Sequence, residues 1–175
     1  MHSFPELVDI STGFALSALN DAQDKVIEGL HNAADTPSVK TLQMIVLQKA
    51  IIAIGMYSLF ESILQDRLNV CNDFYEAISI LDEQGEPDLK ERFETYYLAV
   101  NVLKHGRGRS YDKLVSRYGT LPFRLKLPDE SFFFEGDVSE VSTLVQVDDA
   151  FVIGCAEVIR DVSHVIRRAR PDCFI

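Results

Sequence analysis

The chain has 175 residues, of which 47% are hydrophobic and 25% charged, so it has the composition of one ordinary globular domain rather than of a collagen-like, low-complexity or disordered chain. Its 27 acidic and 17 basic residues give a formal net charge of −10. This charge disfavours broad binding to nucleic acid or anionic lipid, so any contact with RNA must be local. Three widely spaced cysteines (Cys71, Cys155 and Cys173) without a C-x-x-C motif support neither a disulfide framework nor a zinc site and favour a reducing compartment.

The first residues lack the basic region and apolar run of a signal peptide. The most apolar stretch, Ala50 to Phe60, is far shorter than the roughly 20 residues of a membrane span. We therefore expect a cytoplasmic protein without a membrane segment, in which Ala50 to Phe60 forms a buried helix.

The S-x-x-E spacing of Ser3 and Glu6 predicts the start of a first helix that extends to about Ala34. Its apolar residues recur at near-helical steps: Ile10, Phe14, Ala18, Ala22, Val26 and Leu30. A second, long helix is predicted from about Ser38 to Val70, with apolar residues on more than one face, and a short third helix from Asp73 to about Leu81.

Pro87 is typical of the first turn of a helix, and the next helix is predicted from there to the glycines at 106 and 108. Its apolar stripe comprises Leu89, Phe93, Tyr96, Val100 and Leu103. We expect this stripe to face the core.

The segment 107–147 has the least helical pattern and suggests a partly extended excursion with one hairpin. Asp148 or Asp149 can cap a final helix, whose stripe comprises Val152, Cys155, Ile159, Val162 and Ile166. The sequence therefore predicts a single all-α domain over residues 1–175. We expect an up-and-down bundle of four to five helices with an irregular insertion at about 107–147, before the last helix.

Basic side chains and glycines gather in one short segment of this acidic chain, from Asn101 to Tyr111. Asn101 and His105 are four residues apart and share a helix face turned away from the core stripe. Lys104, Arg107 and Arg109 supply charge and hydrogen-bond donors for phosphate oxygens. The alternative is an ordinary helix end, in which Gly106 is the C-cap and the cations complement the helix dipole or are solvated.

Two stretches resemble the HEPN superfamily, whose members are helical bundles of prokaryotic toxin–antitoxin and phage-defence systems. Met56 to Leu64 is similar to the apolar helix with an embedded acid in such bundles. Asn101 to His105 looks like the later part of the family's R-N-x-x-x-H signature. The resemblance implies a metal-independent endoribonuclease with no cofactor, acting on single-stranded or looped RNA, with a cognate antitoxin as a further partner.

The same resemblance implies a homodimer in which the signature helices of two chains face each other across one cleft. His105 would transfer the proton, Asn101 would orient the imidazole or the phosphate, and Lys104, Arg107 and Arg109 would stabilise the charged transition state. Glu61 is either an acid that orients His105 or a residue at the edge of the bundle. Neither clustered carboxylates nor an H-E-x-x-H motif occurs in the sequence, so no metal site is expected.

Val100 stands where the family signature has arginine. This departure, together with the acidic charge, supports an alternative function, a catalytically inactive HEPN-like module that binds a nucleotide, RNA or protein. A second alternative is a helical structural or interaction protein unrelated to that superfamily.

Overall fold

The computed structural model describes residues 2–30, 36–68 and 73–172. These residues contain helices and no strand, which confirms the all-α prediction. The elements in chain order are α1 (Phe4–Leu30), α2 (Thr36–Leu68), α3 (Asp73–Glu83), α4 (Pro87–His105), α5 (Arg109–Ser116), a 3-10 turn (Tyr118–Thr120) and α6 (Asp149–Ala169).

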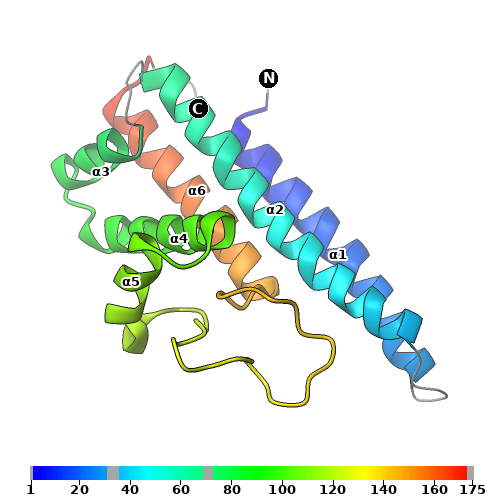
Figure 1. Cartoon of the computed structure of the whole chain (residues 1–175). Helices are drawn as coiled ribbons and strands as arrows, with labels where there is room; N and C mark the ends of the chain where they lie inside the picture. Colours follow the sequence, from blue (N-terminus) through cyan, green and yellow to red (C-terminus); the bar gives the residue numbers. More distant parts are fainter. Residues whose placement is uncertain (1, 31–35, 69–72, 173–175) are drawn as a thin grey trace.

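The long helices α1 and α2 form an antiparallel hairpin, and α6 lies alongside them (Figure 1). Helix α4 lies at an angle across α6, with α3 and α5 at its sides (Figure 1). Helix α6 packs against α1, α2, α3 and α4 and is therefore the central element of the bundle.

Helix α6 follows the sequence pattern closely. All five residues of its predicted stripe are buried. The predicted cap is also present, since the Asp148 carboxylate accepts a hydrogen bond of 2.9 Å from the backbone N–H of Phe151. Burial raises the pKa of the Cys155 thiol, which keeps this free cysteine protonated and unreactive. Cys71 and Cys173 lie outside the described residues.

Helix α4 approaches α6 most closely at Gly154, where a Cβ atom would collide with the phenol of Tyr96. Burial there, together with the neighbouring Cys155, raises the pKa of Tyr96 to about 12. The predicted stripe of α4 is largely confirmed: Phe93, Tyr96 and Val100 are buried, whereas Leu89 and Leu103 are half-buried. Pro87 stands in the first turn, as predicted.

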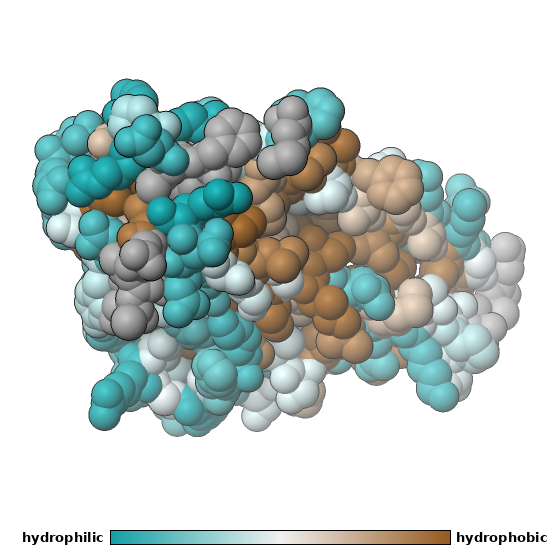
Figure 2. Space-filling view, turned by 90° about the horizontal axis from the view of Figure 1, so that it is seen from above, coloured by the Kyte–Doolittle hydropathy of each residue, from teal (hydrophilic) through white to brown (hydrophobic). Residues whose placement is uncertain are grey.

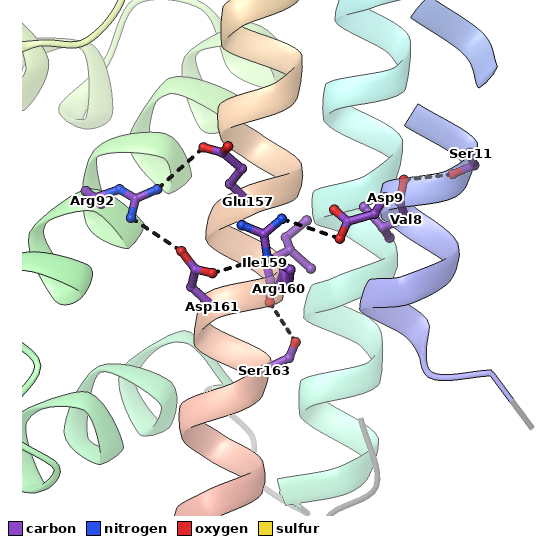
Figure 3. Close-up of polar contacts among 9 residues, drawn as sticks. All are labelled: Val8, Asp9, Ser11, Arg92, Glu157, Ile159, Arg160, Asp161 and Ser163. Carbon is purple, nitrogen blue, oxygen red and sulfur yellow. Dashed lines mark hydrogen bonds and ion pairs between the residues drawn. The ribbon is translucent and has the colours of Figure 1, made fainter. Parts of the chain in front are cut away.

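Ion pairs join α4, α6 and α1 along one side of the bundle (Figure 3). Arg92 of α4 lies 3.4 Å from Asp161 and 3.9 Å from Glu157, both on α6. Arg160 of α6 lies 3.3 Å from Asp161 and 3.5 Å from Asp9 of α1. Because these groups are about one third to one half exposed, the pairs contribute little stability and chiefly fix how the helices are oriented.

The first two helices are confirmed, but their apolar residues do not all face the core. Helix α1 buries Pro5, Val8, Thr12 and Leu16, whereas none of the six residues of its predicted stripe is buried and Phe14 is 78% exposed. The stretch Ala50 to Phe60 is likewise not buried throughout, since one side of α2 faces solvent. By length and composition α2 could cross a membrane, although core helices of soluble proteins pass the same test. The predicted helix ends at Ala34 and Val70 lie outside the described residues.

The insertion differs from its prediction in two ways. Residues 109–116 form helix α5, because Tyr111 and Leu114 bury one side of this turn against the bundle. The predicted hairpin is reduced to one antiparallel bridge, between Leu125 and Val145. The remainder of the segment is irregular, as expected.

The insertion has no sheet in its described residues, and a buried ion pair between two of its residues holds it together instead. The Nζ atom of Lys126 lies 2.7 Å from Glu140, and the two side chains are 7% and 10% exposed. The Glu140 carboxylate also accepts hydrogen bonds from the backbone N–H groups of Phe133 and Phe134. Burial alone would raise the pKa of Glu140, but the bonds from Lys126 and from these two N–H groups outweigh it and lower the pKa.

Replacing Gly154 by alanine should destabilise the fold by about 1–3 kcal/mol, because the added methyl group displaces Tyr96. Gly13→Ala is the matched control. A Cβ atom at this exposed helical glycine has no neighbour within 4 Å, so the change should stabilise α1 by up to about 1 kcal/mol. Urea denaturation followed by circular dichroism measures both effects. Equal stabilities for the two variants would contradict the close packing of α4 on α6.

Replacing Glu140 by alanine should lower the free energy of unfolding by about 3 kcal/mol, since it leaves the Lys126 ammonium buried without a counter-charge.

The folded-state pKa of Glu140 is lowered, so the contribution of its carboxylate to stability is complete at neutral pH and is lost as the pH falls below about 4. The difference in unfolding free energy between wild type and Glu140→Gln should therefore shrink between pH 7 and about pH 3. Glu135→Gln, at an exposed position of the same loop, should show no such difference at either pH.

Candidate functional site

The end of α4 presents the residues that the sequence singled out. Gly106 ends the helix with a φ angle of 74° and donates its N–H to the Val102 carbonyl at 2.8 Å. A positive φ angle suits glycine and lets the chain leave the helix at once. Asn101 is half-buried and His105 exposed on one outward side of α4, whereas Val100 is 1% exposed in the core.

The four basic or imidazole-bearing side chains from Lys104 to Arg109 do not form one cluster. Lys104 binds Glu61 of α2, with 3.2 Å between its Nζ atom and the carboxylate, and both side chains are about one quarter exposed. Glu61 therefore lies against Lys104, and no hydrogen bond joins it to His105 in the described part of the chain. This ion pair holds the end of α4 against α2 and partly neutralises the Lys104 charge.

Arg107 is engaged by the insertion. Its guanidinium donates to the Pro128 carbonyl at 3.2 Å and lies over the Tyr111 ring, 5.6 Å from the ring centre. Tyr111 is buried and donates its hydroxyl to the Lys126 carbonyl at 2.7 Å, so it is a packing residue. Arg109 is exposed and has no hydrogen bond or ion pair with another described residue. Among the three predicted phosphate ligands, Arg109 is thus the one whose charge faces solvent without a partner in the described structure.

A pocket of about 360 Å³ opens between α3, α4 and α5, on the side of α4 that carries Asn101. Its lining combines aromatic, amide, hydroxyl and charged groups: Phe74, Tyr75, Glu94, Tyr97, Leu98, Asn101, Ser110, Lys113 and Arg117. The Asn101 side chain makes no hydrogen bond with any other described residue, so its amide is free to bind a ligand. His105 is one turn further along the same side of α4 and does not line the pocket.

The pocket supplies both a flat apolar surface and positive charge. The rings of Phe74 and Tyr97 stack with their centres 3.8 Å apart, and Tyr75 is 66% exposed beside them. Lys113 is exposed, and Arg117 is held by Glu94 at the long distance of 3.5 Å. An aromatic ring with an attached anion suits such a site, because the ring can stack while the anion meets the cations.

Sequence reasoning missed the α3 and α5 sides of this pocket. Ser110, Lys113 and Arg117 are spaced three and four residues apart, which places them on one side of a helix. This spacing is present in the sequence, but the two glycines that precede it predict an irregular segment. No sequence pattern marked Tyr75 as a site residue, since only the packing of α3 beside α4 brings it to the pocket.

Within residues 2–30, 36–68 and 73–172, no group of three or more His, Cys, Asp or Glu side chains is arranged to hold a metal ion. No protein-family model, no curated protein and no solved structure matches this chain.

Proposed function

We propose that this protein acts on RNA as a HEPN-like, metal-independent endoribonuclease, with His105 as the group that transfers the proton. The observation that carries the proposal is the placement of Asn101 and His105 on one outward side of α4, beside a pocket with exposed cations and an exposed tyrosine. In a chain of net charge −10, this corner can attract a phosphodiester locally.

Cleavage requires no group beyond the RNA and the protein. The ribose 2′-hydroxyl attacks the adjacent phosphorus, a new P–O bond forms, and the bond from phosphorus to the 5′-oxygen breaks. An imidazole can take up the hydroxyl proton and return it to the leaving 5′-oxygen near neutral pH, so the protons balance, and this is the role proposed for His105. The products are a 2′,3′-cyclic phosphate and a 5′-hydroxyl end.

The cation that stabilises the transition state must come from elsewhere than the family position, because Val100 is buried in the core. Arg109 fits this role best, since Lys104 is paired with Glu61 and Arg107 is bonded to the insertion. Guanidinium groups suit the task because their forked donors match two phosphate oxygens. Asn101 would hold the phosphate or the imidazole by its free amide.

The pocket gives the RNA a place to bind beside His105. Tyr75 offers an exposed ring on which a base can stack, and Lys113 offers a charge for the next phosphate. Single-stranded or looped RNA fits this arrangement, because stacking on a protein ring requires an unpaired base. A role in toxin–antitoxin or phage-defence systems and a cognate antitoxin belong to the same proposal.

A second candidate function is binding of RNA or a nucleotide without cleavage. Two observations favour it. Position 100 holds an uncharged valine where the family signature has arginine, and Glu61 partly neutralises Lys104, so little positive charge is left in the immediate neighbourhood of His105. The two functions differ in one observable, since the second predicts binding without new RNA ends.

We expect wild-type protein to cut mixed single-stranded RNA in the presence of EDTA and His105→Ala to lose at least 100-fold in rate, since removal of a general acid–base group costs about 10²–10⁴-fold. His164→Ala is the matched control, because His164 is an exposed histidine on α6 and should leave the rate unchanged. End-group analysis should find 2′,3′-cyclic phosphates. Equal cleavage by wild type and His105→Ala would refute the catalytic assignment, and binding without any cleavage would establish the second candidate.

The pocket is tested by binding in the His105→Ala background, where the RNA stays intact. Tyr75→Ala and Lys113→Ala should each weaken binding of a fluorescent single-stranded oligoribonucleotide about tenfold, because they remove a stacking surface and a charge. Lys25→Ala, on an exposed part of α1, should leave the affinity unchanged. Fluorescence anisotropy at fixed salt gives the dissociation constants. If all three variants bind equally well, the pocket is not the RNA site.

A further inference from the structure

One side of the α1–α2 hairpin exposes large apolar side chains in a broad patch, which is interrupted by a few more hydrophilic side chains (Figure 2). We call this patch the hairpin face. It comprises Leu7, Ile10 and Phe14 of α1 and Met44, Leu47, Ile51 and Leu59 of α2, which are 47–78% exposed. Each exposes on the order of 100 Å², so the face presents roughly 700 Å², more than the largest patch of a typical monomer at about 300–600 Å².

The hairpin face bears no formal charge. Between Leu7 and Phe14 the sole charged residue is Asp9, which pairs with Arg160 of α6. Between Met44 and Leu59 the sole charged residue is Lys49, which is 7% exposed and pairs with Asp149 at 2.7 Å. A binding partner must therefore be apolar and uncharged over the same area, since a charged partner would lose its hydration without gaining a counter-charge.

A glycine interrupts the centre of the exposed row on α2. Leu47, Ile51, Gly55 and Leu59 follow one another at steps of four and so form one ridge of the helix. A Cβ atom at Gly55 would have no neighbour within 4 Å, so no packing within the chain requires glycine there. Glycine is also unfavourable inside a helix. The ridge thus has a notch that suits the close approach of another helix.

A lipid bilayer does not fit this face, despite the apolar composition of α2. The opposite side of α2 packs against α4 and α6 and holds the Lys49–Asp149 ion pair, so the helix cannot be inserted without dismantling the core. Helices that lie on a membrane surface carry flanking basic residues, whereas this chain has a net charge of −10.

We infer that the hairpin face binds the same face of a second copy of this chain, which makes the protein a symmetric homodimer through α1 and α2. The face is uncharged, as its partner must be, and about 700 Å² per chain is close to the roughly 800 Å² that each partner buries in a standard interface. Two α2 ridges can cross at Gly55 in the commonest packing class of helices, in which rows of residues four apart interdigitate.

This interface lies on α1 and α2, whereas the resemblance to the HEPN superfamily implied contact through the helix that carries Asn101 and His105. It holds whether or not the protein cuts RNA. Its test measures assembly alone, so its failure and the failure of the proposed function can be told apart.

Sedimentation velocity from about 1 to 100 µM should show a dimer for wild type and a monomer for Ile51→Glu, because the carboxylate would be buried at the interface. Tyr118→Glu is the control, since it places the same charge on an exposed aromatic residue outside the hairpin face, and this variant should remain a dimer. A monomeric wild type, or a dimeric Ile51→Glu, would overturn the inference.

Gly55→Ala gives a second and gentler test. The methyl group meets nothing within the chain, so the helical circular dichroism should be retained, but the notch is filled and dimer dissociation should become at least tenfold easier. An unchanged dissociation constant would overturn the crossing at Gly55.

Flotation of wild type with phosphatidylcholine vesicles should leave the protein unbound, and co-flotation would assign the hairpin face to lipid instead.

Discussion

The close approach of α4 to α6 at Gly154 determines which side of α4 this molecule presents to solvent. Because a side chain at position 154 would collide with Tyr96, the glycine sets both the distance and the rotation of α4. With Tyr96 and Val100 turned into the core, Asn101 and His105 necessarily face outward. The Arg92 ion pairs with Asp161 and Glu157 reinforce this orientation from the solvent side (Figure 3). The same contact that fills the core therefore selects the exposed side of α4.

The turn after α4 then builds the pocket. Gly106 ends the helix in a conformation with positive φ, and α5 begins three residues later. Tyr111 and Leu114 bury one side of α5, so Ser110, Lys113 and Arg117 are left on the side that lines the pocket with Asn101. The packing of α5 on the bundle thus places positive charge near the side-chain amide of Asn101. No catalytic role is needed to explain the fold of this turn.

The sequence predicted those features that depend on a single helix. The stripes of α4 and α6, the cap at Asp148 and the outward side of Asn101 and His105 follow from spacing alone, because a 3.6-residue period fixes which residues share a side. Spacing does not say what packs against a stripe, and for this reason Phe14 of α1 is periodic yet exposed. The pocket could not be predicted, since it requires α3, α4 and α5 to meet. Helix α5 was missed because the glycines at 106 and 108 resemble the start of a loop.

An acidic protein can contact RNA as proposed if some cations near α4 point into solvent while others are paired within the chain. Glu61 neutralises Lys104 and the insertion engages Arg107, so these two groups contribute structure rather than a long-range field. Arg109 and Lys113 are exposed and lie at the first and fifth positions of α5. Since charges on an acidic surface attract a polyanion only within about a Debye length, of roughly 8–10 Å, a phosphodiester would be held at the α4–α5 corner and repelled over most of the rest of the surface. A restricted electrostatic target of this kind favours short, flexible RNA segments over long duplexes, because a duplex brings many more phosphates against the acidic surface than it can place at the corner.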